Sequence, residues 1–192
     1  APESAPVYDC SKQSGISTGY ISMSKPAAED IQFKVTYLKD GSQTEYNWVS
    51  GAVKTTEGND TTFDLGIGDN MTIGEGGYAF TIDLASSTAL FHKFETVGLV
   101  GNATAAGWPD DSNPTCDELM TFNTANGMYE YTGAFTAGEF KVRFDYNWDE
   151  NLGGSLTDMV RNGNNIAVTE AGTYKCVLDM TKKPFTFTMT KQ

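Results

Sequence analysis

Two tryptophans in this sequence stand outside the segments that have strand-like patterns. Trp108 lies between Gly107 and Pro109 in GNATAAGWPDD, and Trp148 follows Asn147 in DYNWDEN. Large aromatic side chains normally fill cores, so two of them in loops need an explanation. An exposed flat ring can stack on the apolar face of a sugar, whereas a ring at the end of a domain can simply cap its core. The residue types leave both interpretations open.

Hydrogen-bonding side chains lie close to both tryptophans in the sequence. The segment EFKVRF alternates, which predicts a strand with Phe140, Val142 and Phe144 on its buried face. The opposite face then presents Lys141 and Arg143 to water, and charged donors form the stronger hydrogen bonds. From these residue types, the candidate partners for sugar hydroxyls are Lys141, Arg143, Asn147 and Asn165.

The sequence offers little for catalysis. The only histidine, His92, lies in an apolar strand, which excludes sites built from several histidines, and no phosphate-binding loop or GxSxG motif is present. Asp145, Asp149 and Glu150 cluster near Trp148, and a glycosidase needs two carboxylates at a defined separation. Solvated surface acids are the commoner explanation of such a cluster. We therefore expect no catalytic residue and no enzyme activity.

Metal and cofactor sites are not expected either. The segments Pro109–Asn113 and Asp145–Asn151 contain oxygen donors that calcium accepts, but neither has the EF-hand spacing, and both are rich in ordinary turn formers. Cys10, Cys116 and Cys176 show no CxxC spacing and can form at most one disulfide, so no disulfide scaffold is predicted.

Composition and charge limit the possible partners. The 192 residues carry a net charge of −12, which disfavours nucleic acid and anionic membrane surfaces and leaves a neutral or cationic partner. Hydrophobic residues make up 39% of the chain, enough for packed cores. No apolar run is long enough to span a membrane. The start, APESAPVYDC, has no signal-peptide pattern and is typical of a mature or trimmed sequence.

Short alternating segments separated by Gly, Asn, Asp and Pro predict an all-β fold. The expected strands are 19–24, 31–38, 78–84, 89–94, 96–100, 118–122, 128–135, 139–144, 173–180 and 184–190. Only residues 155–161 have a weak helical pattern.

An internal repeat divides the chain in two. The segment that begins at Asp69 resembles the segment that begins at Asn164, with Met71/Ile166, Tyr78/Tyr174 and Asp83/Asp179 in register once one gap is allowed. Likewise QFKVTY at residue 32 resembles EFKVRF, and Asn47-Trp48 resembles Asn147-Trp148 if seven residues are looped out. We expect two tandem immunoglobulin-like or starch-binding-module-like β-sandwiches, a reduced one at 1–94 and a complete one at 95–192.

Three ordered motifs in the second copy carry a family resemblance. GLVGNATAAGWPDD, GEFKVRFDYNWDENLGG and GNNIAVTEAGTYKCVLDM resemble the starch-binding domains of the SusE/SusF outer-membrane lipoproteins, over about residues 96–192 and more weakly over 31–94. The resemblance implies non-catalytic modules in which two aromatics form an arc against a helical glucan, with a basic residue and an amide bonding its hydroxyls.

Carried onto this chain, the resemblance places Trp108 and Trp148 at the aromatic positions, Lys141 at the basic position and Asn165, or its neighbour Asn164, near the amide. Arg143 and Tyr146 lie beside these without a family position. The first copy keeps Lys34 and Trp48 but lacks the GW loop, so we expect it to be a spacer or a degenerate unit.

The resemblance further implies a cell-surface lipoprotein of the outer membrane, held by a lipid anchor outside this sequence, beside components of a glycan-uptake complex. We expect an oligo- or polysaccharide ligand, with an α-glucan favoured. The alternative is a structural or protein-interaction β-sandwich of an envelope complex. That alternative predicts that Trp108 and Trp148 are buried or pack on each other, whereas glycan binding predicts two exposed rings facing one groove that Lys141 borders.

Overall fold

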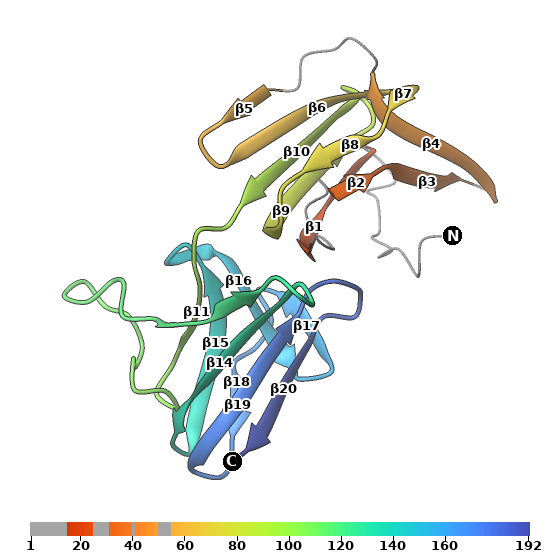
Figure 1. Cartoon of the computed structure of the whole chain (residues 1–192). Coiled ribbons are helices and arrows are strands. Elements are labelled where there is room, and N and C mark those ends of the chain that lie inside the picture. The colour runs from red at the N-terminus through yellow and green to blue at the C-terminus, as the bar shows by residue number, and fades with distance from the viewer. Residues whose placement is uncertain (1–14, 25–30, 40, 50–54) are drawn as a thin grey trace. The chain divides into compact units, whose positions relative to one another are not determined.

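The computed structural model describes residues 15–24, 31–39, 41–49 and 55–192, which form strands, turns and loops and no helix. These residues divide into two compact units, the first ending at Lys93 and the second running from Phe94 to Gln192 (Figure 1). The predicted all-β class is therefore confirmed. In the described part of the chain there is no helix long and apolar enough to cross a membrane.

The first unit has one large antiparallel sheet and a two-stranded one. The large sheet has the order β1-β9-β10-β6-β4-β3, with β5 on β6 and β7 on β4, and β2 pairs with β8. The strands are β1 (Ile16–Met23), β2 (Ile31–Phe33), β3 (Val35–Lys39), β4 (Ser42–Val49), β5 (Thr55–Glu57), β6 (Asp60–Gly66), β7 (Gly68–Asp69), β8 (Met71–Ile73), β9 (Gly76–Asp83) and β10 (Thr88–Lys93).

The small β2–β8 sheet covers one face of the large sheet (Figure 1). Phe33 on β2 lies edge to face with Phe63 on β6, at 6.1 Å between ring centroids, and with Phe91 on β10, at 5.2 Å. This is a favoured geometry for aromatic pairs. Around these rings the core of the first unit contains Leu65, Met71, Ile73, Tyr78, Phe80, Ile82 and Ala89.

The second unit consists of two sheets. One has the order β12-β11-β15-β16-β17 with β18 on β15, and the other has the order β13-β14-β19-β20. The strands are β11 (Val97–Val100), β12 (Glu118–Leu119), β13 (Thr121–Asn123), β14 (Met128–Phe135), β15 (Gly138–Phe144), β16 (Asn147–Ser155), β17 (Asp158–Arg161), β18 (Ile166–Val168), β19 (Gly172–Asp179) and β20 (Thr186–Lys191).

The two sheets of the second unit pack face to face, which makes this unit a β-sandwich. Phe140 on β15 contacts Phe135 on β14, at 5.7 Å between ring centroids, and Phe187 on β20, at 5.2 Å. The predicted alternation is confirmed, since Phe140, Val142 and Phe144 are fully buried. Phe94, which the sequence assigns to the end of the first domain, stacks on Phe144 at 4.1 Å and lies in the second unit.

The internal repeat is visible in the strand pairing. Phe33 pairs with Met71 in the first unit, and the corresponding residues of the second unit, Phe140 and Ile166, pair in the same way. In each unit the next two strands form an antiparallel hairpin, β9–β10 in the first and β19–β20 in the second. The equivalence that the sequence predicts for β2 with β15 and for β8 with β18 is therefore a structural one.

Side-chain hydrogen bonds repeat as well. Tyr78 donates from its hydroxyl to the carbonyl four residues earlier at 2.7 Å, and Tyr174 makes the same bond at 2.8 Å. Asp83 accepts from the backbone N–H of Ala85, and Asp179 accepts from that of Thr181, so each carboxylate caps the turn of its hairpin. These bonds explain why the tyrosines and aspartates keep their places in both copies.

Two local predictions are wrong. Residues 155–161 form the β16–β17 hairpin, closed at Ser155 and Asp158, and not a helical turn. A single helical turn is weak without a longer helix, whereas the hairpin completes a ladder and buries Met159. The expected strand 31–38 divides at Lys34 into β2 and β3, which pair with β8 and β4.

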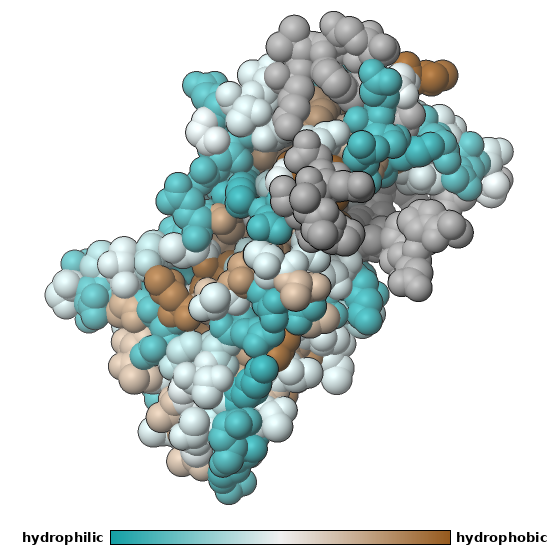
Figure 2. All heavy atoms as spheres, in the orientation of Figure 1, coloured by the Kyte–Doolittle hydropathy of each residue, from teal (hydrophilic) through white to brown (hydrophobic). Residues whose placement is uncertain are grey.

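The visible surface of both units is mostly hydrophilic or neutral, with hydrophobic residues in small areas (Figure 2). This agrees with the high net charge of −12. Two of the three cysteines, Cys116 and Cys176, are free thiols, and Cys10 lies outside the described residues. Burial raises the pKa of Cys176 to about 12, so this thiol stays protonated and inert at neutral pH.

The contact of Phe140 with both sheets predicts a large effect on stability. Phe140→Ala should lower the free energy of unfolding by about 3–5 kcal/mol, because it removes apolar contacts and leaves a cavity between the sheets. Thr188→Ala, on the exposed face of β20, is the matched control and should change stability by no more than about 0.5 kcal/mol. Urea unfolding followed by tryptophan fluorescence measures both, and equal effects would contradict the assigned core.

Candidate functional site

Trp148 lies directly after a tight hairpin turn and not in a long loop. Phe144 at the end of β15 pairs with Asn147 at the start of β16, so only Asp145 and Tyr146 form the turn. Both have positive φ, 50° and 56°, the conformation of a type I′ turn, which matches the twist of the flanking strands. The prediction that Trp148 lies in a loop is therefore wrong: the chain turns in two residues, and Trp148 belongs to β16.

A bulge in β16 pushes Trp148 out of the ladder. Phe144 pairs with Asn147, but the preceding residue, Arg143, pairs with Asn151, so residues 148–150 lie outside the regular pairing. Such bulges redirect side chains at the edges of sheets. The bulge is held by hydrogen bonds from Asn151 Nδ2 to the Trp148 carbonyl (2.6 Å), from the Asp149 N–H to Asn147 Oδ1 (3.0 Å) and from Arg161 to the Asp149 carbonyl (3.1 Å).

Trp108 lies on the segment that connects β11 to β12. The segment begins with a bridge between Gly101 and Gly107, and the N–H of Gly101 donates to the Gly107 carbonyl at 2.8 Å. Gly107 has φ of +70°, which favours glycine. Further along, Asp110 Oδ1 accepts the Ser112 hydroxyl at 2.6 Å and closes a turn. The segment is thus ordered by its own hydrogen bonds, and Trp108 as predicted is not in a strand.

The structure brings the two predicted tryptophans together. Their ring centroids are 6.2 Å apart and the ring planes are tilted by 37°. Trp108 is 38% exposed and Trp148 is 42% exposed. The rings therefore contact each other, as the structural alternative predicts, and also remain open to solvent, as glycan binding predicts. The result is a bent, solvent-exposed aromatic surface, which we call the tryptophan pair.

Arg143 does not face water as the alternation predicts. It is 2% exposed, and its guanidinium lies beneath Trp148 with Cζ 5.1 Å from the ring centroid. It pairs with the carboxylate of Asp117, whose side chain is 1% exposed. The connecting segment covers this part of the sheet and excludes water from it. Arg143 is thus buried by the same segment that carries Trp108.

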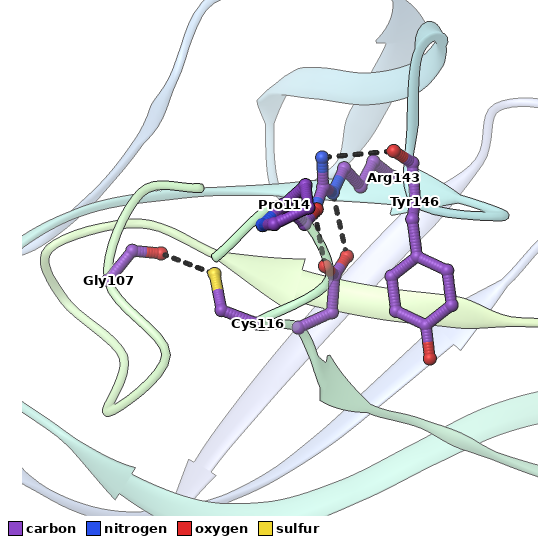
Figure 3. A network of polar contacts seen from close by, with 6 residues as sticks. Gly107, Pro114, Cys116, Arg143 and Tyr146 are labelled. Atoms are coloured by element: carbon purple, nitrogen blue, oxygen red, sulfur yellow. Dashed lines mark hydrogen bonds and ion pairs between the residues drawn. The ribbon is translucent and has the colours of Figure 1, made fainter. Parts of the chain in front are cut away.

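The guanidinium also donates to two backbone carbonyls. One bond, of 2.6 Å, goes to Pro114 in the connecting segment, and the other, of 3.1 Å, goes to Tyr146 in the hairpin turn (Figure 3). The same view shows Cys116 directed at the carbonyl of Gly107, at 3.9 Å. The Tyr146 side chain leads away from the guanidinium, so Tyr146 takes part in this network through its backbone.

Lys141 and Asn165 extend the site along β15. Lys141 is half-buried on the same face as Arg143, and this burial lowers the pKa of its ammonium group. Next in the row is Glu139, which accepts from Asn165 Nδ2 at 3.0 Å. Glu139 and Arg143 are four residues apart on one strand, or about 13 Å. The structure therefore places Asn165 at the far end of a row that begins at the tryptophan pair.

Asn147 has a local role in the turn. Its Oδ1 accepts the Asp149 N–H, an arrangement typical of Asx turns. Its side chain is otherwise exposed beside Trp148. The site thus contains an exposed amide next to the tryptophan pair, and this amide also holds the start of the bulge.

Two of the three acids near Trp148 have structural partners for their carboxylates. Asp145 accepts the backbone N–H groups of Glu95 and Thr96, each at 2.8 Å, and Glu150 pairs with Arg161 at 2.7 Å. Among the described residues no three histidine, cysteine or acidic side chains converge as metal ligands would.

The described residues of the first unit do not reproduce this site. Lys34, between β2 and β3, is exposed and paired with Glu45 at 2.9 Å. Asn47 and Trp48 lie far along β4 and pair with Gly66 and Leu65, whereas Asn147 directly follows its turn. Asn47-Trp48 and Asn147-Trp148 therefore occupy different positions in their hairpins, and the predicted equivalence is wrong. The side chain of Trp48 lies outside the described residues.

Sequence reasoning missed two residues that shape the site. Asp117 precedes a short strand and has no motif, and Gly98 lies in the apolar run VGLVG. Gly98 is directly opposite Arg143 in the ladder, and a Cβ at this position would lie 2.5 Å from Asp117 Cβ. Glycine is therefore needed for Asp117 to reach Arg143. A glycine in the middle of a strand is the one sequence signal for this close approach.

One family model matches the part of the chain that holds this site. Residues 96–184 match the family described as Pullulanase X25 domain. This family consists of non-catalytic carbohydrate-binding modules of starch-binding type. The match covers most of the second unit and all seven candidate residues, and it indicates a carbohydrate-binding β-sandwich. No curated protein matches the chain.

The turn at Asp110 gives a pH-dependent prediction. The Ser112 hydroxyl, followed by the backbone N–H groups of Ser112 and Asn113, lowers the pKa of Asp110 from its ordinary value of 3.8. The stabilisation of this turn is present above that ordinary value and is lost as the pH falls through the lower pKa of the folded state. Ser112→Ala should raise the Asp110 titration midpoint, measured by carboxyl ¹³C NMR.

Asp83 provides the internal control for this titration, because its pKa is lowered by Ser86 in the first unit. Its midpoint should be the same in the wild type and in Ser112→Ala. An Asp110 midpoint that Ser112→Ala leaves unchanged would show that the hydroxyl does not hold the turn.

Proposed function

We propose that the second unit binds a neutral polysaccharide without catalysing any reaction on it. One observation carries this proposal: two tryptophan rings, 38% and 42% exposed, lie side by side in a unit that matches a carbohydrate-binding family. An aromatic ring offers an apolar face to the C–H groups of a sugar. The net charge of −12 suits a neutral ligand and disfavours nucleic acid.

The tilt of 37° between the rings supports an α-glucan, such as starch or a maltooligosaccharide, as the favoured ligand. Two coplanar rings would suit a flat, extended chain. Two tilted rings form a shallow bend, and a bend suits a chain that curves from one sugar to the next. This shape agrees with the aromatic arc of the SusE/SusF starch-binding domains, which the motifs of the second copy resemble.

Polar side chains around the rings supply hydrogen bonds to hydroxyls. Lys141 lies on the same sheet face as the tryptophan pair and donates from a charged group, which strengthens its hydrogen bonds. Asn147 offers an exposed amide beside Trp148. Asn165, held by Glu139, can meet a longer glucan farther along the row.

A shallow site of this kind binds weakly, and a dissociation constant of about 1 mM corresponds to only about −4 kcal/mol. Retention of a polymer then depends on several sites sharing one chain, because the second contact is intramolecular. The proposed role is therefore capture of glycan chains and not tight recognition of a single sugar.

The proposed setting is the cell surface of an outer membrane, with the protein held by a lipid anchor outside this sequence and placed beside the components of a glycan-uptake complex. The resemblance to SusE/SusF supports this setting. Protease accessibility on intact cells and fractionation of their membranes test it, and recovery of the protein only from the cell interior would contradict it.

A structural or protein-interaction role is the second candidate, because the two rings contact each other at 6.2 Å. In that role the tryptophan pair closes the end of the sandwich or meets a protein partner. The two candidates differ in a panel of glycans, since only the first predicts retardation in any of them.

The tryptophan pair gives the main test. Trp108→Ala and Trp148→Ala should each weaken retardation in α-glucan affinity gels by roughly 5-fold or more, equivalent to about 1 kcal/mol of lost stacking. Because both rings are partly exposed, their removal should change the melting temperature little. Affinity electrophoresis across a panel of glucans, with thermal unfolding in parallel, measures both quantities.

Ile67→Ala is the matched control for the tryptophan variants. Ile67 is an exposed large hydrophobic residue of the first unit, 93% exposed, so its loss removes apolar surface outside the site. The Ile67→Ala variant should be retarded in the glucan gels as much as the wild type. If the tryptophan variants also migrate like the wild type in every glucan that retards it, the site is assigned to the wrong residues.

Lys141 tests the polar half of the site. Lys141→Met keeps the length of the side chain and removes its ammonium group, so it should weaken glucan retardation by roughly 3-fold to 10-fold if that group bonds a hydroxyl. Lys182→Met, in the exposed connection between β19 and β20, removes the same charge elsewhere and should have no effect. Equal retardation of the two variants would exclude Lys141 from the site.

A further inference from the structure

The tryptophan pair belongs to two separate chain segments that share one buried cation. Trp108 is carried by the segment between β11 and β12, and Trp148 by the bulge of β16. Neither ring is fixed by a regular ladder, since residues 148–150 leave the pairing and the connecting segment has only an isolated bridge at each of two points. Side-chain contacts beneath the rings therefore help to set their relative position.

Arg143 connects to the segment of Trp108. Its Nε and one terminal nitrogen bond the two carboxylate oxygens of Asp117, at 2.8 and 2.5 Å, and that terminal nitrogen also donates to the Pro114 carbonyl at 2.6 Å. The paired side chains are 2% and 1% exposed. Such a bidentate pair is directional as well as strong. It fixes the end of the connecting segment to the face of β15 (Figure 3).

The same guanidinium connects to the segment of Trp148. Its other terminal nitrogen donates to the Tyr146 carbonyl in the hairpin turn at 3.1 Å. The Trp148 ring lies over the guanidinium carbon at 5.1 Å, within the range of a cation–π contact. Arg143 thus supports Trp148 from below and holds the turn that precedes it.

A lysine could not make these contacts at once. The planar guanidinium offers donors in several fixed directions, whereas an ammonium group is a point charge on a flexible stem. A buried cation also needs its partners, because an unpaired one is costly. The strand, the connecting segment and the turn are therefore linked through a single side chain.

We propose that Arg143 is a positioning residue that holds Trp108 and Trp148 at their mutual tilt before any ligand arrives. The expected gain in affinity rests on the proposed function, whereas the positioning of the two rings concerns the protein without a ligand. Rings that are already ordered lose less conformational entropy on binding, so more of the stacking energy remains as affinity. In this role Arg143 contributes to affinity without a bond to sugar.

The experiment removes both members of the buried pair. Arg143→Met with Asp117→Leu replaces the ion pair by apolar groups of similar size, a change that often leaves stability intact. The first readout is the exciton couplet of the two indoles in circular dichroism, which depends on their distance and angle. Trp108→Phe and Trp148→Phe identify the couplet, since each leaves a single indole in the site.

The paired variant should keep its melting transition, lose at least about half of the couplet and bind α-glucan roughly 5-fold more weakly. Lys175→Met with Glu130→Leu is the matched control. It removes an ion pair on the other sheet, in which Lys175 Nζ and Glu130 Oε2 are 3.1 Å apart. The control should keep the couplet and the affinity of the wild type.

Arg143→Lys is the second variant and keeps the charge beside Asp117. It should also lose couplet and affinity, because one ammonium group cannot hold Pro114, Tyr146 and the ring together. This variant decides the matter if the paired replacement fails to fold. A wild-type couplet in either folded variant overturns the proposal, as does a wild-type protein whose couplet does not depend on both tryptophans.

The two proposals fail in different ways. If no glucan retards the wild type but the couplet disappears in the Arg143 variants, the proposed function is wrong and the positioning role stands. If glucan binding depends on both tryptophans but the couplet and affinity survive in those variants, the function stands and Arg143 does not position the rings.

Discussion

The arrangement of the candidate site depends on the guanidinium of Arg143, which is buried on the outer face of a sheet in the second unit. The face of a sandwich strand opposite the core ordinarily meets water, and there a cation needs no partner. Arg143 lies on that face at 2% exposure, so the chain around it must provide a carboxylate and carbonyls within reach. The covering segment, the missing side chain at Gly98 and the position of the hairpin turn all follow from that requirement. The tryptophan pair lies on top of this arrangement.

The two units show which structural features the internal repeat shares. Both keep the pairing of β2 with β8 or of β15 with β18, the tyrosine bonded to a carbonyl four residues back, and the aspartate that caps the hairpin. These features build the sheets and their turns. Where the structure describes the first unit, it shows no counterpart to the segment that carries Trp108, and Lys34 is paired with Glu45. The shared features therefore support the fold, and among the described residues the aromatic surface belongs to the second unit.

Alternation and turn residues are enough to predict the all-β class and the buried face of β15, because these depend on local sequence. Alternation does not predict the burial of Arg143, because it assigns a residue to a face of the sheet but does not show that another segment of the chain covers that face. A carboxylate oxygen of Asp117 lies 2.5 Å from a terminal nitrogen of Arg143, but Asp117 belongs to no recognisable motif in the sequence. The bulge in β16 cannot be predicted from the sequence pattern either, because a register shift is set by the pairing of two strands and not by one strand alone.

The bulge has a consequence for how such a protein can change. Asn147 pairs with Phe144 before residues 148–150, and Leu152 pairs with Val142 after them, so the ladder is closed on both sides. Substitutions within those three positions alter the exposed surface while the core positions of β15 and β16 keep their neighbours. If the proposed function holds, mutation there can vary ligand preference while the core packing is kept. The exposed residues of the bulge can therefore vary, whereas the core residues of β15 and β16 must keep their packing.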